Sequence, residues 1–143
     1  MAVEAVRSLL RDPASLPENR SGGMPPADSI EVSVVLVGDS EIHALNAAWR
    51  DKDKPTDVLS WPLAGDNEPL EGALGDIVVS VDTAARQAAA RGWSVEEELA
   101  LLFVHGTLHL LGHEDDTEAG SEEMRRIERG ILGKPLDAIE CPA

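Results

Sequence analysis

The chain has 143 residues, which is enough for one domain over residues 1–143 with a buried core and too few for two domains of ordinary size. Its formal net charge of −15 at pH 7 argues against broad nonspecific binding to nucleic acid or anionic membranes, and we expect no DNA partner. The single cysteine, Cys141, excludes an intrachain disulfide, and without a signal-peptide core or an apolar run of transmembrane length the sequence predicts a cytoplasmic protein.

The N-terminal half of the sequence predicts two helices and one strand. Residues 2–11 carry apolar side chains at helical spacing, and residues 30–37 become continuously apolar and β-branched, as in a buried strand. Between them, residues 14–29 are rich in Pro, Gly, Ser and Asn, which predicts a flexible loop. Residues 41–49 again show helical spacing, and Ser40 is the expected cap of that helix.

The C-terminal half predicts two strands that pair as a hairpin, followed by three helices. The strands are residues 57–61 and 73–81, which are separated by a polar turn. The first helix opens at residue 82 or 83 and ends near residue 91. The second, residues 94–111, begins with a capping box and is apolar nearly all round from residue 99 to residue 111, so we expect it to be the central, buried helix. The third, residues 118–132, has an amphipathic pattern.

Three of the four histidines lie between residues 104 and 116, and two of them have the spacing of a metal site. His105 and His109 are four residues apart, which places both imidazoles on one face of a helix. Gly112 is a plausible helix stop, and if the chain turns back there, Asp115 can reach the same cation. Two nitrogens and one oxygen leave a fourth position open, which is typical of a catalytic zinc. We therefore predict one zinc ion.

The third ligand has competitors, and the motif departs from the well-known zinc-protease helix. A small shift of the loop presents His113 or Asp116 instead, and we rank Asp115 first and His113 second. In the protease helix, a Glu directly follows the first His as general base, whereas this chain has Gly106 there. Peptide hydrolysis in that style is therefore disfavoured. The spacing from the second histidine to Gly112 and to the third ligand nonetheless matches the extended metzincin pattern.

Two groups of cations stand out, and the residues alone favour a structural reading of both. The first group contains Arg50, Lys52 and Lys54. Neighbouring acids at Asp51, Asp53 and Asp57 predict a solvated loop in which each base is neutralised. The second group, on the last predicted helix, contains Arg125, Arg126 and Arg129. It is offset by Glu122, Glu123 and Glu128, which predicts an ordinary surface face.

Aromatic residues are few: three tryptophans, one phenylalanine and no tyrosine. Tryptophans can stack on the bases of a single-stranded nucleic acid. In a chain so poor in aromatic residues we instead expect them in the core. The three are Trp49, Trp61 and Trp93.

Several stretches of the sequence together resemble one known family. They are Leu45-Asn46 with Trp49-Arg50, Asp53-Lys54-Pro55-Thr56-Asp57-Val58-Leu59-Ser60-Trp61-Pro62, Leu74-Gly75-Asp76-Ile77, and His105-Gly106-Thr107-Leu108-His109-Leu110-Leu111-Gly112. Their order and spacing also match, over roughly residues 30–132. On these motifs the sequence resembles the YbeY family of bacterial endoribonucleases, which is associated with ribosomal RNA maturation and ribosome quality control.

The resemblance implies a single α+β domain, in which helices pack a small mixed β-sheet and a central helix carries the metal site. It implies metal-dependent cleavage of single-stranded RNA, in maturation of the 3′ end of the small-subunit ribosomal RNA and in ribosome quality control. The implied partners are ribosomal RNA and the ribosome or ribosome-associated proteins. Two other functions stay open: a metallohydrolase acting on another substrate such as a peptide, and a non-catalytic ribosome-associated binding module.

The family's metal ligands carry over with one departure. Two of its three histidines fall on His105 and His109, and the third falls on Asp115. The resemblance therefore leaves open a His-His-Asp site, a shifted site that uses His113, and a weakened site. A second departure is that the family usually has a strand before its first helix, whereas this sequence starts in the helix.

Two further residues are expected to have catalytic roles, the first from the family resemblance and the second from its position beside Asp115. The family's important arginine falls on Arg50, which changes the expectation for this residue from a solvated loop to a phosphate contact. The planar fork of arginine suits a phosphate better than lysine does. Glu114, beside the expected third ligand, is the candidate proton acceptor.

Overall fold

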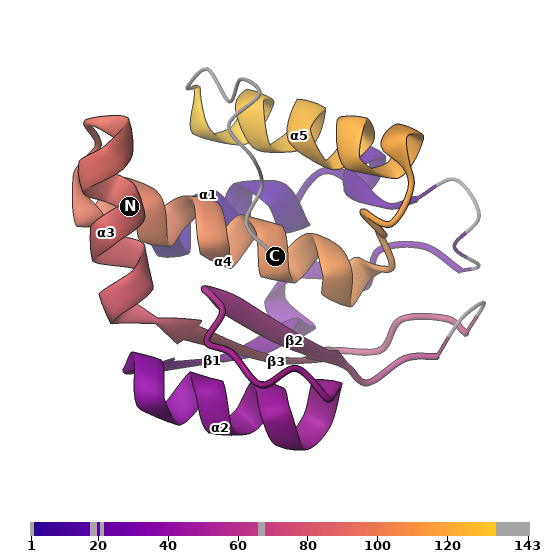
Figure 1. The fold of residues 1–143 in the computed structure, drawn as a ribbon. Helices are drawn as coiled ribbons and strands as arrows, with labels where there is room; N and C mark the ends of the chain where they lie inside the picture. The colour runs from indigo at the N-terminus through magenta and orange to yellow at the C-terminus, as the bar shows by residue number, and fades with distance from the viewer. Residues whose placement is uncertain (1, 18–19, 21, 66–67, 134–143) are drawn as a thin grey trace.

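The fold is built on a mixed sheet with the strand order β1-β3-β2 (Figure 1). The strands are β1 (Glu31–Val37), β2 (Val58–Pro62) and β3 (Ala73–Ser80). β1 and β3 are parallel, whereas β2 and β3 are antiparallel, which confirms the predicted pairing of the second and third strands. The computed structural model describes residues 2–17, 20, 22–65 and 68–133, and Cys141 lies outside them.

Helices cover both faces of the sheet. Within the described residues they are α1 (Ala2–Leu10), α2 (Asp39–Arg50), α3 (Val81–Arg91), α4 (Val95–Leu111) and α5 (Glu118–Leu132). α2 lies on one face of the sheet and α4 on the other, and α1 and α5 pack against α4 (Figure 1). The α+β fold with a small mixed sheet and a central helix is therefore confirmed. None of the described helices combines the length and apolar character needed to cross a membrane.

The segment predicted as a flexible loop holds two short 3₁₀ helices, η1 (Pro13–Ser15) and η2 (Ala27–Ser29), at its described ends. At η1, the Asp12 carboxylate accepts a hydrogen bond from the backbone N–H of Ala14 at 3.0 Å. The flexibility of residues 14–29 and the extent of one domain over residues 1–143 stay predictions.

Alternation along β3 explains why the sheet is buried on both faces. Ile77 and Val79 are fully buried in the main apolar cluster with Leu108 and Leu110 of α4. Val78, which points to the opposite face, joins a second cluster under α2. Each fully buried aliphatic side chain stabilises the fold by about 1.5–3 kcal/mol. The central helix is therefore held in a fixed place on the sheet.

Local sequence signals set both ends of α4. The Ser94 hydroxyl accepts a hydrogen bond from the Glu97 N–H at 3.1 Å, and the Glu97 carboxylate accepts one from the Ser94 N–H at 2.9 Å. This is the predicted capping box. The helix ends at Gly112, whose φ of 110° is one that glycine adopts far more readily than other residues. The chain therefore turns back directly after the second histidine.

The predicted start of α2 was wrong by two residues, and the cause is a contact from another part of the chain. The N-cap is Gly38 rather than Ser40. The carboxylate of Glu41 accepts a hydrogen bond from the Gly38 N–H at 3.0 Å, and that of Asp82 accepts one from the Asp39 N–H at 2.9 Å. The Asp82 side chain thus accepts a hydrogen bond from a helix N–H that would otherwise donate to the side chain of a local N-cap residue.

The expected core position is wrong for one tryptophan. Trp49 is 67% exposed, since it lies in the last turn of α2, beyond the cluster that Ile42 and Leu45 form with the sheet. Trp61 and Trp93 are half-buried.

Candidate active site

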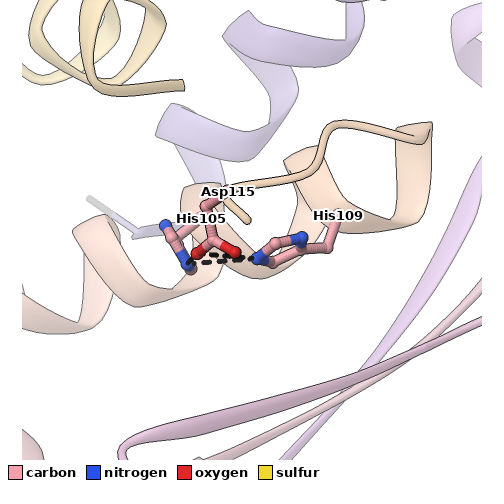
Figure 2. A group of neighbouring side chains, drawn as sticks. All are labelled: His105, His109 and Asp115. Carbon is pink, nitrogen blue, oxygen red and sulfur yellow. Dashed lines mark hydrogen bonds and ion pairs between the residues drawn. The ribbon is translucent and has the colours of Figure 1, made fainter. Parts of the chain in front are cut away.

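The turn at the end of α4 brings three possible metal ligands together. The Nε2 atoms of His105 and His109 lie 3.3 Å apart, and Oδ2 of Asp115 lies 3.6 Å from each of them (Figure 2). One ligand atom from each side chain fits within a group no wider than 4.8 Å. His105 is 2% exposed, whereas His109 and Asp115 are half-buried, so the group faces outward from a buried base.

Each histidine is oriented by a hydrogen bond from its other ring nitrogen. Nδ1 of His105 donates to the Glu128 carboxylate at 2.7 Å, and Nδ1 of His109 donates to the backbone carbonyl of His113 at 2.9 Å. In the neutral rings both Nε2 atoms therefore carry lone pairs and face the same point. A hydrogen-bond acceptor behind each ligating imidazole is the usual arrangement at protein metal sites.

The two rings differ in how readily they take a proton. Burial acts to lower the pKa of His105, but the hydrogen bond to Glu128 and the negative charges of Glu128 and Asp115 outweigh it, and the pKa is raised. The pKa of His109 is lowered, first by burial and then by the charge on His105. Only one of the two rings thus takes a proton readily, because two like charges at 3.3 Å repel each other.

The spacing of the donor atoms fits zinc. Two nitrogens bound to one tetrahedral zinc ion at about 2.0–2.1 Å lie about 3.3–3.4 Å apart. The two Nε2 atoms have this separation, 3.3 Å. Two imidazoles and one carboxylate are also a ligand set that zinc accepts while keeping a position open.

The structure does not bring the other ligand candidates into this group. The His113 ring is 6% exposed, and its Nε2 donates to the carbonyl of Ser15 at 2.5 Å. Burial also lowers the pKa of His113, so its ring stays neutral and packed. Asp116 is exposed and belongs to no group of possible metal ligands among the described residues. Glu114 is exposed on the wall of the adjacent cleft.

A cleft of about 740 Å³ joins the His-His-Asp group to the first group of cations. Its lining includes His105, His109 and Asp115 together with Arg50, Lys52 and Lys54. This volume lies within the usual range for ligand sites of proteins. Parts of the chain about 50 residues apart in sequence therefore form one concave surface, which holds both cationic side chains and the candidate metal ligands.

The cations of the cleft are not neutralised as the sequence suggested. Asp53 pairs with His43 at 2.8 Å, and Asp57 is 2% exposed. Within the described part of the chain, Lys52 and Lys54 form no ion pair. The expectation of a self-neutralised loop is therefore wrong.

Arg50 is held in place by two contacts with β2. Its guanidinium donates a hydrogen bond to the carbonyl of Ser60. The same group lies over the ring of Trp61, 5.8 Å from the ring centre. Because Arg50 itself remains exposed and lines the cleft, the remaining N–H groups of its fork are available to a ligand.

Glu128 is a site residue that the sequence reading missed. It was expected to offset surface arginines, yet it is fully buried and binds His105. The signal was present in the helical pattern, because Glu128 follows Met124 by four residues and so lies on the buried face of α5. A carboxylate on that face requires a partner inside the protein.

Asp57 is a second buried carboxylate that reasoning from the residues assigned to a solvated loop. It lines the floor of the cleft, and its Oδ2 has no hydrogen-bond partner among the described residues. Burial raises the pKa of Asp57, against the opposing charge of His105 and a hydrogen bond with Gln87.

Comparisons with known proteins agree with the resemblance. A protein from Aquifex aeolicus (strain VF5) named Endoribonuclease YbeY is 48% identical over 115 residues, covering 78% of this chain and 75% of that protein. One of the same name from Desulfitobacterium hafniense (strain Y51) is 40% identical over 142 residues, covering 84% and 90%. The solution structure of TM1509 from Thermotoga maritima has the same fold, with a TM-score of 0.55 at 23% identity over 98% of this chain and 89% of that one. Residues 15–135 match the family model described as Endoribonuclease YbeY, and the chain therefore belongs to the YbeY family of endoribonucleases.

Proposed function

We propose that this protein is a metal-dependent endoribonuclease that cleaves single-stranded RNA. Its relatives carry the name Endoribonuclease, which supports RNA as the substrate. We place its activity in the cytoplasm, in maturation of the 3′ end of small-subunit ribosomal RNA and in ribosome quality control, as the family resemblance implies. The proposed partners are ribosomal RNA and the ribosome or ribosome-associated proteins.

One observation carries the proposal: a single cleft is lined by the His-His-Asp group and by Arg50, Lys52 and Lys54. Cleavage of a phosphodiester requires a group that stabilises the charge developing on the phosphate. Lys52 and Lys54 have no carboxylate partner in the described part of the chain, so their charge is available to the sugar-phosphate backbone. A cleft with these two halves suits an anionic phosphodiester better than a neutral peptide.

The proposed ligands of a zinc ion are His105, His109 and Asp115. When bound there, zinc supplies Lewis-acid polarisation of a water or of a phosphate oxygen. Arg50, held against Ser60 and Trp61, positions the phosphate and stabilises its growing negative charge.

Glu114 is the proposed proton acceptor, because its carboxylate lines the cleft beside Asp115. It takes a proton from the attacking water at a side-chain oxygen. Glu114→Gln removes this basicity at nearly constant shape, and we expect a decrease in kcat of about 100-fold or more with little change in KM.

The overall charge of −15 shapes how the protein meets RNA. The cleft opposes this overall charge with only a small group of cations, Arg50, Lys52 and Lys54, so we expect weak, salt-sensitive binding of RNA by the protein alone. A ribosomal or protein partner that positions the RNA raises its effective concentration at the cleft. Tight binding of arbitrary RNA at physiological salt contradicts this view.

The test incubates the purified protein with single-stranded RNA and with casein, each with and without a chelator. We expect chelator-sensitive cleavage of RNA and no cleavage of casein. Cleavage of casein alone indicates a metallohydrolase of another class. Absence of both activities, together with a low metal content, indicates a ribosome-associated binding module.

A variant sharpens the test at the cation half of the cleft. Arg50→Lys keeps one positive charge but loses the fork that reaches both Ser60 and a phosphate. We expect RNA cleavage to fall by at least 10-fold, while Arg126→Lys, on α5 outside the cleft, retains full activity. Full activity of Arg50→Lys argues against the proposed role.

A further inference from the structure

Helix α3 contributes a further cation, Arg86, to the lining of the cleft. Thr83, Arg86 and Gln87 of α3 belong to its lining. Because β1 and β3 are parallel, α2 and α3 begin at the same edge of the sheet, and Arg86 pairs with Asp39 in the first turn of α2 at 2.9 Å. Arg50 lies at the other end of α2 (Figure 1). The backbone ends of a helix of this length are about 16–18 Å apart, so the two arginines reach the cleft from near opposite ends of α2.

The guanidinium of Arg86 is fixed although it is exposed. Its Nη1 pairs with the Asp39 carboxylate at 2.9 Å, and its Nη2 donates to the Thr83 hydroxyl at 3.0 Å. Two anchors on two different nitrogens set the plane of the group. The side chain nevertheless remains 63% exposed, so its free N–H groups face solvent in the cleft.

Arg86 also serves a structural role at Asp39, whose two carboxylate oxygens have different partners. Oδ1 accepts hydrogen bonds from the hydroxyls of Ser80 and Thr83, both at 2.6 Å, whereas Arg86 pairs with Oδ2. These two bonds, ahead of Arg86, lower the pKa of Asp39 to about 2. An exposed ion pair adds little stability and restricts a long side chain. The contacts with Asp39 and Thr83 therefore order Arg86, and they leave its remaining N–H groups available to a ligand in the cleft.

We propose that Arg86 binds a backbone phosphate of the RNA strand, so that the cleft holds the strand at a second point besides Arg50. The proposal rests on the proposed endoribonuclease function and adds a second phosphate subsite to it. Since the two arginines reach the cleft from near opposite ends of α2, they contact different phosphates of the strand. Arg86 is thus a residue that sets the length of single-stranded RNA that the protein uses.

The experiment compares Arg86→Gln with the unchanged protein on a single-stranded oligoribonucleotide and on a series in which one linkage at a time is a neutral methylphosphonate. We expect Arg86→Gln to raise KM about 5- to 20-fold on the all-phosphate strand, with kcat within about twofold. The slope of log affinity against log salt should fall by about one. At one position in the strand, the methylphosphonate should weaken binding by the unchanged protein and leave binding by the variant unaffected.

Arg126→Gln is the matched control, because Arg126 is 65% exposed and pairs with Glu123 on α5 outside the cleft. We expect its KM and salt slope to be unchanged. A KM of Arg86→Gln within twofold of the unchanged protein, or a loss shared equally by every methylphosphonate strand, overturns the proposal.

A binding measurement separates this proposal from the proposed function. Fluorescence anisotropy with the same strands, in chelator so that no cleavage occurs, reports the affinity directly. If the unchanged protein cleaves no RNA, the endoribonuclease function fails, while a weaker affinity of Arg86→Gln still supports the phosphate subsite. Equal affinities of the two proteins refute the subsite whether or not RNA is cleaved.

Discussion

The Glu128 carboxylate lies 2.7 Å from Nδ1 of His105, and both side chains are buried in the interface between α4 and α5. The other oxygen of Glu128, Oε1, has no hydrogen-bond partner among the described residues. The contact with His105 is thus the main polar interaction of this carboxylate. Glu128 fixes the ring so that Nε2 points toward His109 and Asp115.

From this contact we predict that Glu128→Gln weakens zinc binding about 10- to 100-fold. The amide oxygen can still accept a hydrogen bond from His105, but it lacks the charge that makes the ring a better donor to the metal. Competition with a chromophoric chelator at pH 7 measures the affinity. Glu122→Gln, an exposed acid on the same helix, is the control and should bind zinc normally. Equal affinities of the two variants argue against the orienting role of Glu128.

The identity of the third ligand leads to a second prediction. Asp115→Ala and His109→Ala should each lose most of the bound zinc after dialysis, because two ligands hold the ion far less well than three. His113→Ala should keep a stoichiometric ion, since its ring is directed to the Ser15 carbonyl. Elemental analysis of the dialysed proteins measures the metal. Loss of zinc from His113→Ala with retention by Asp115→Ala reverses the assignment.

A third prediction concerns Asp57 and the dependence of stability on pH. Because burial raises the pKa of Asp57 in the folded state above its ordinary value of 3.8, folding favours the protonated acid. The contribution of Asp57 to the free energy of unfolding is therefore highest below pH 3.8. It decreases as the pH rises through the pKa of the folded state. At neutral pH the buried carboxylate is destabilising.

Asp57→Asn should accordingly stabilise the metal-free protein at pH 7, by about 1–2 kcal/mol, because an unsatisfied buried acceptor is replaced by an amide. The new amide N–H₂ can also donate a hydrogen bond to Oε1 of Gln87, which has no partner among the described residues. Urea unfolding in chelator at pH 7 and at pH 3.5 measures both free energies. The gain should vanish at the lower pH, and a gain of equal size at both values excludes ionisation as the cause.

The fourth prediction follows from the close approach of α4 to the sheet. A Cβ added at Gly106 would lie 2.9 Å from Cγ2 of the fully buried Ile77. Overpacking of this kind costs about 1–3 kcal/mol, and the better helix propensity of Ala returns about 1 kcal/mol. We expect Gly106→Ala to lower the free energy of unfolding by about 1 kcal/mol in a urea titration.

Gly130→Ala on α5 is the matched control for this substitution. A Cβ at Gly130 meets nothing within 4 Å, so helix propensity alone should raise the stability by up to about 1 kcal/mol. The two substitutions should therefore have opposite signs. A stabilising Gly106→Ala shows that Ile77 can move aside at little cost.

Features set by neighbouring residues were predictable from the sequence. The capping box at Ser94 and the turn at Gly112 define α4, and the four-residue spacing of His105 and His109 places both rings on one face of it. The start of α2 was not predictable, because Asp82 supplies an acceptor to it from 43 residues away. Local rules cannot report such a partner.

The polar side chains of the site were harder to assign than its helices. Charge patterning put Glu128 on the surface, whereas the apolar stripe of α5 had already placed that position inside. From its place in the sequence, Asp53 was expected to pair with the neighbouring lysines. It pairs with His43 on α2 instead. Arg50 drew attention only through the family resemblance. In each case a contact between elements distant in sequence decided the role of the side chain.

The buried His113 ties the loop of the candidate metal site to the first residues of the region that matches the family, through the carbonyl of Ser15, 98 residues earlier in the chain. Arg20 adds a second tie of the same kind, because its Nε donates to the Leu111 carbonyl at 3.1 Å. Contacts of such large sequence separation form late, since closing long loops is slow. We therefore expect the turn that carries Asp115 to reach its final place only after the N-terminal segment has docked. Uptake of zinc at the candidate site should then lag behind helix formation during refolding.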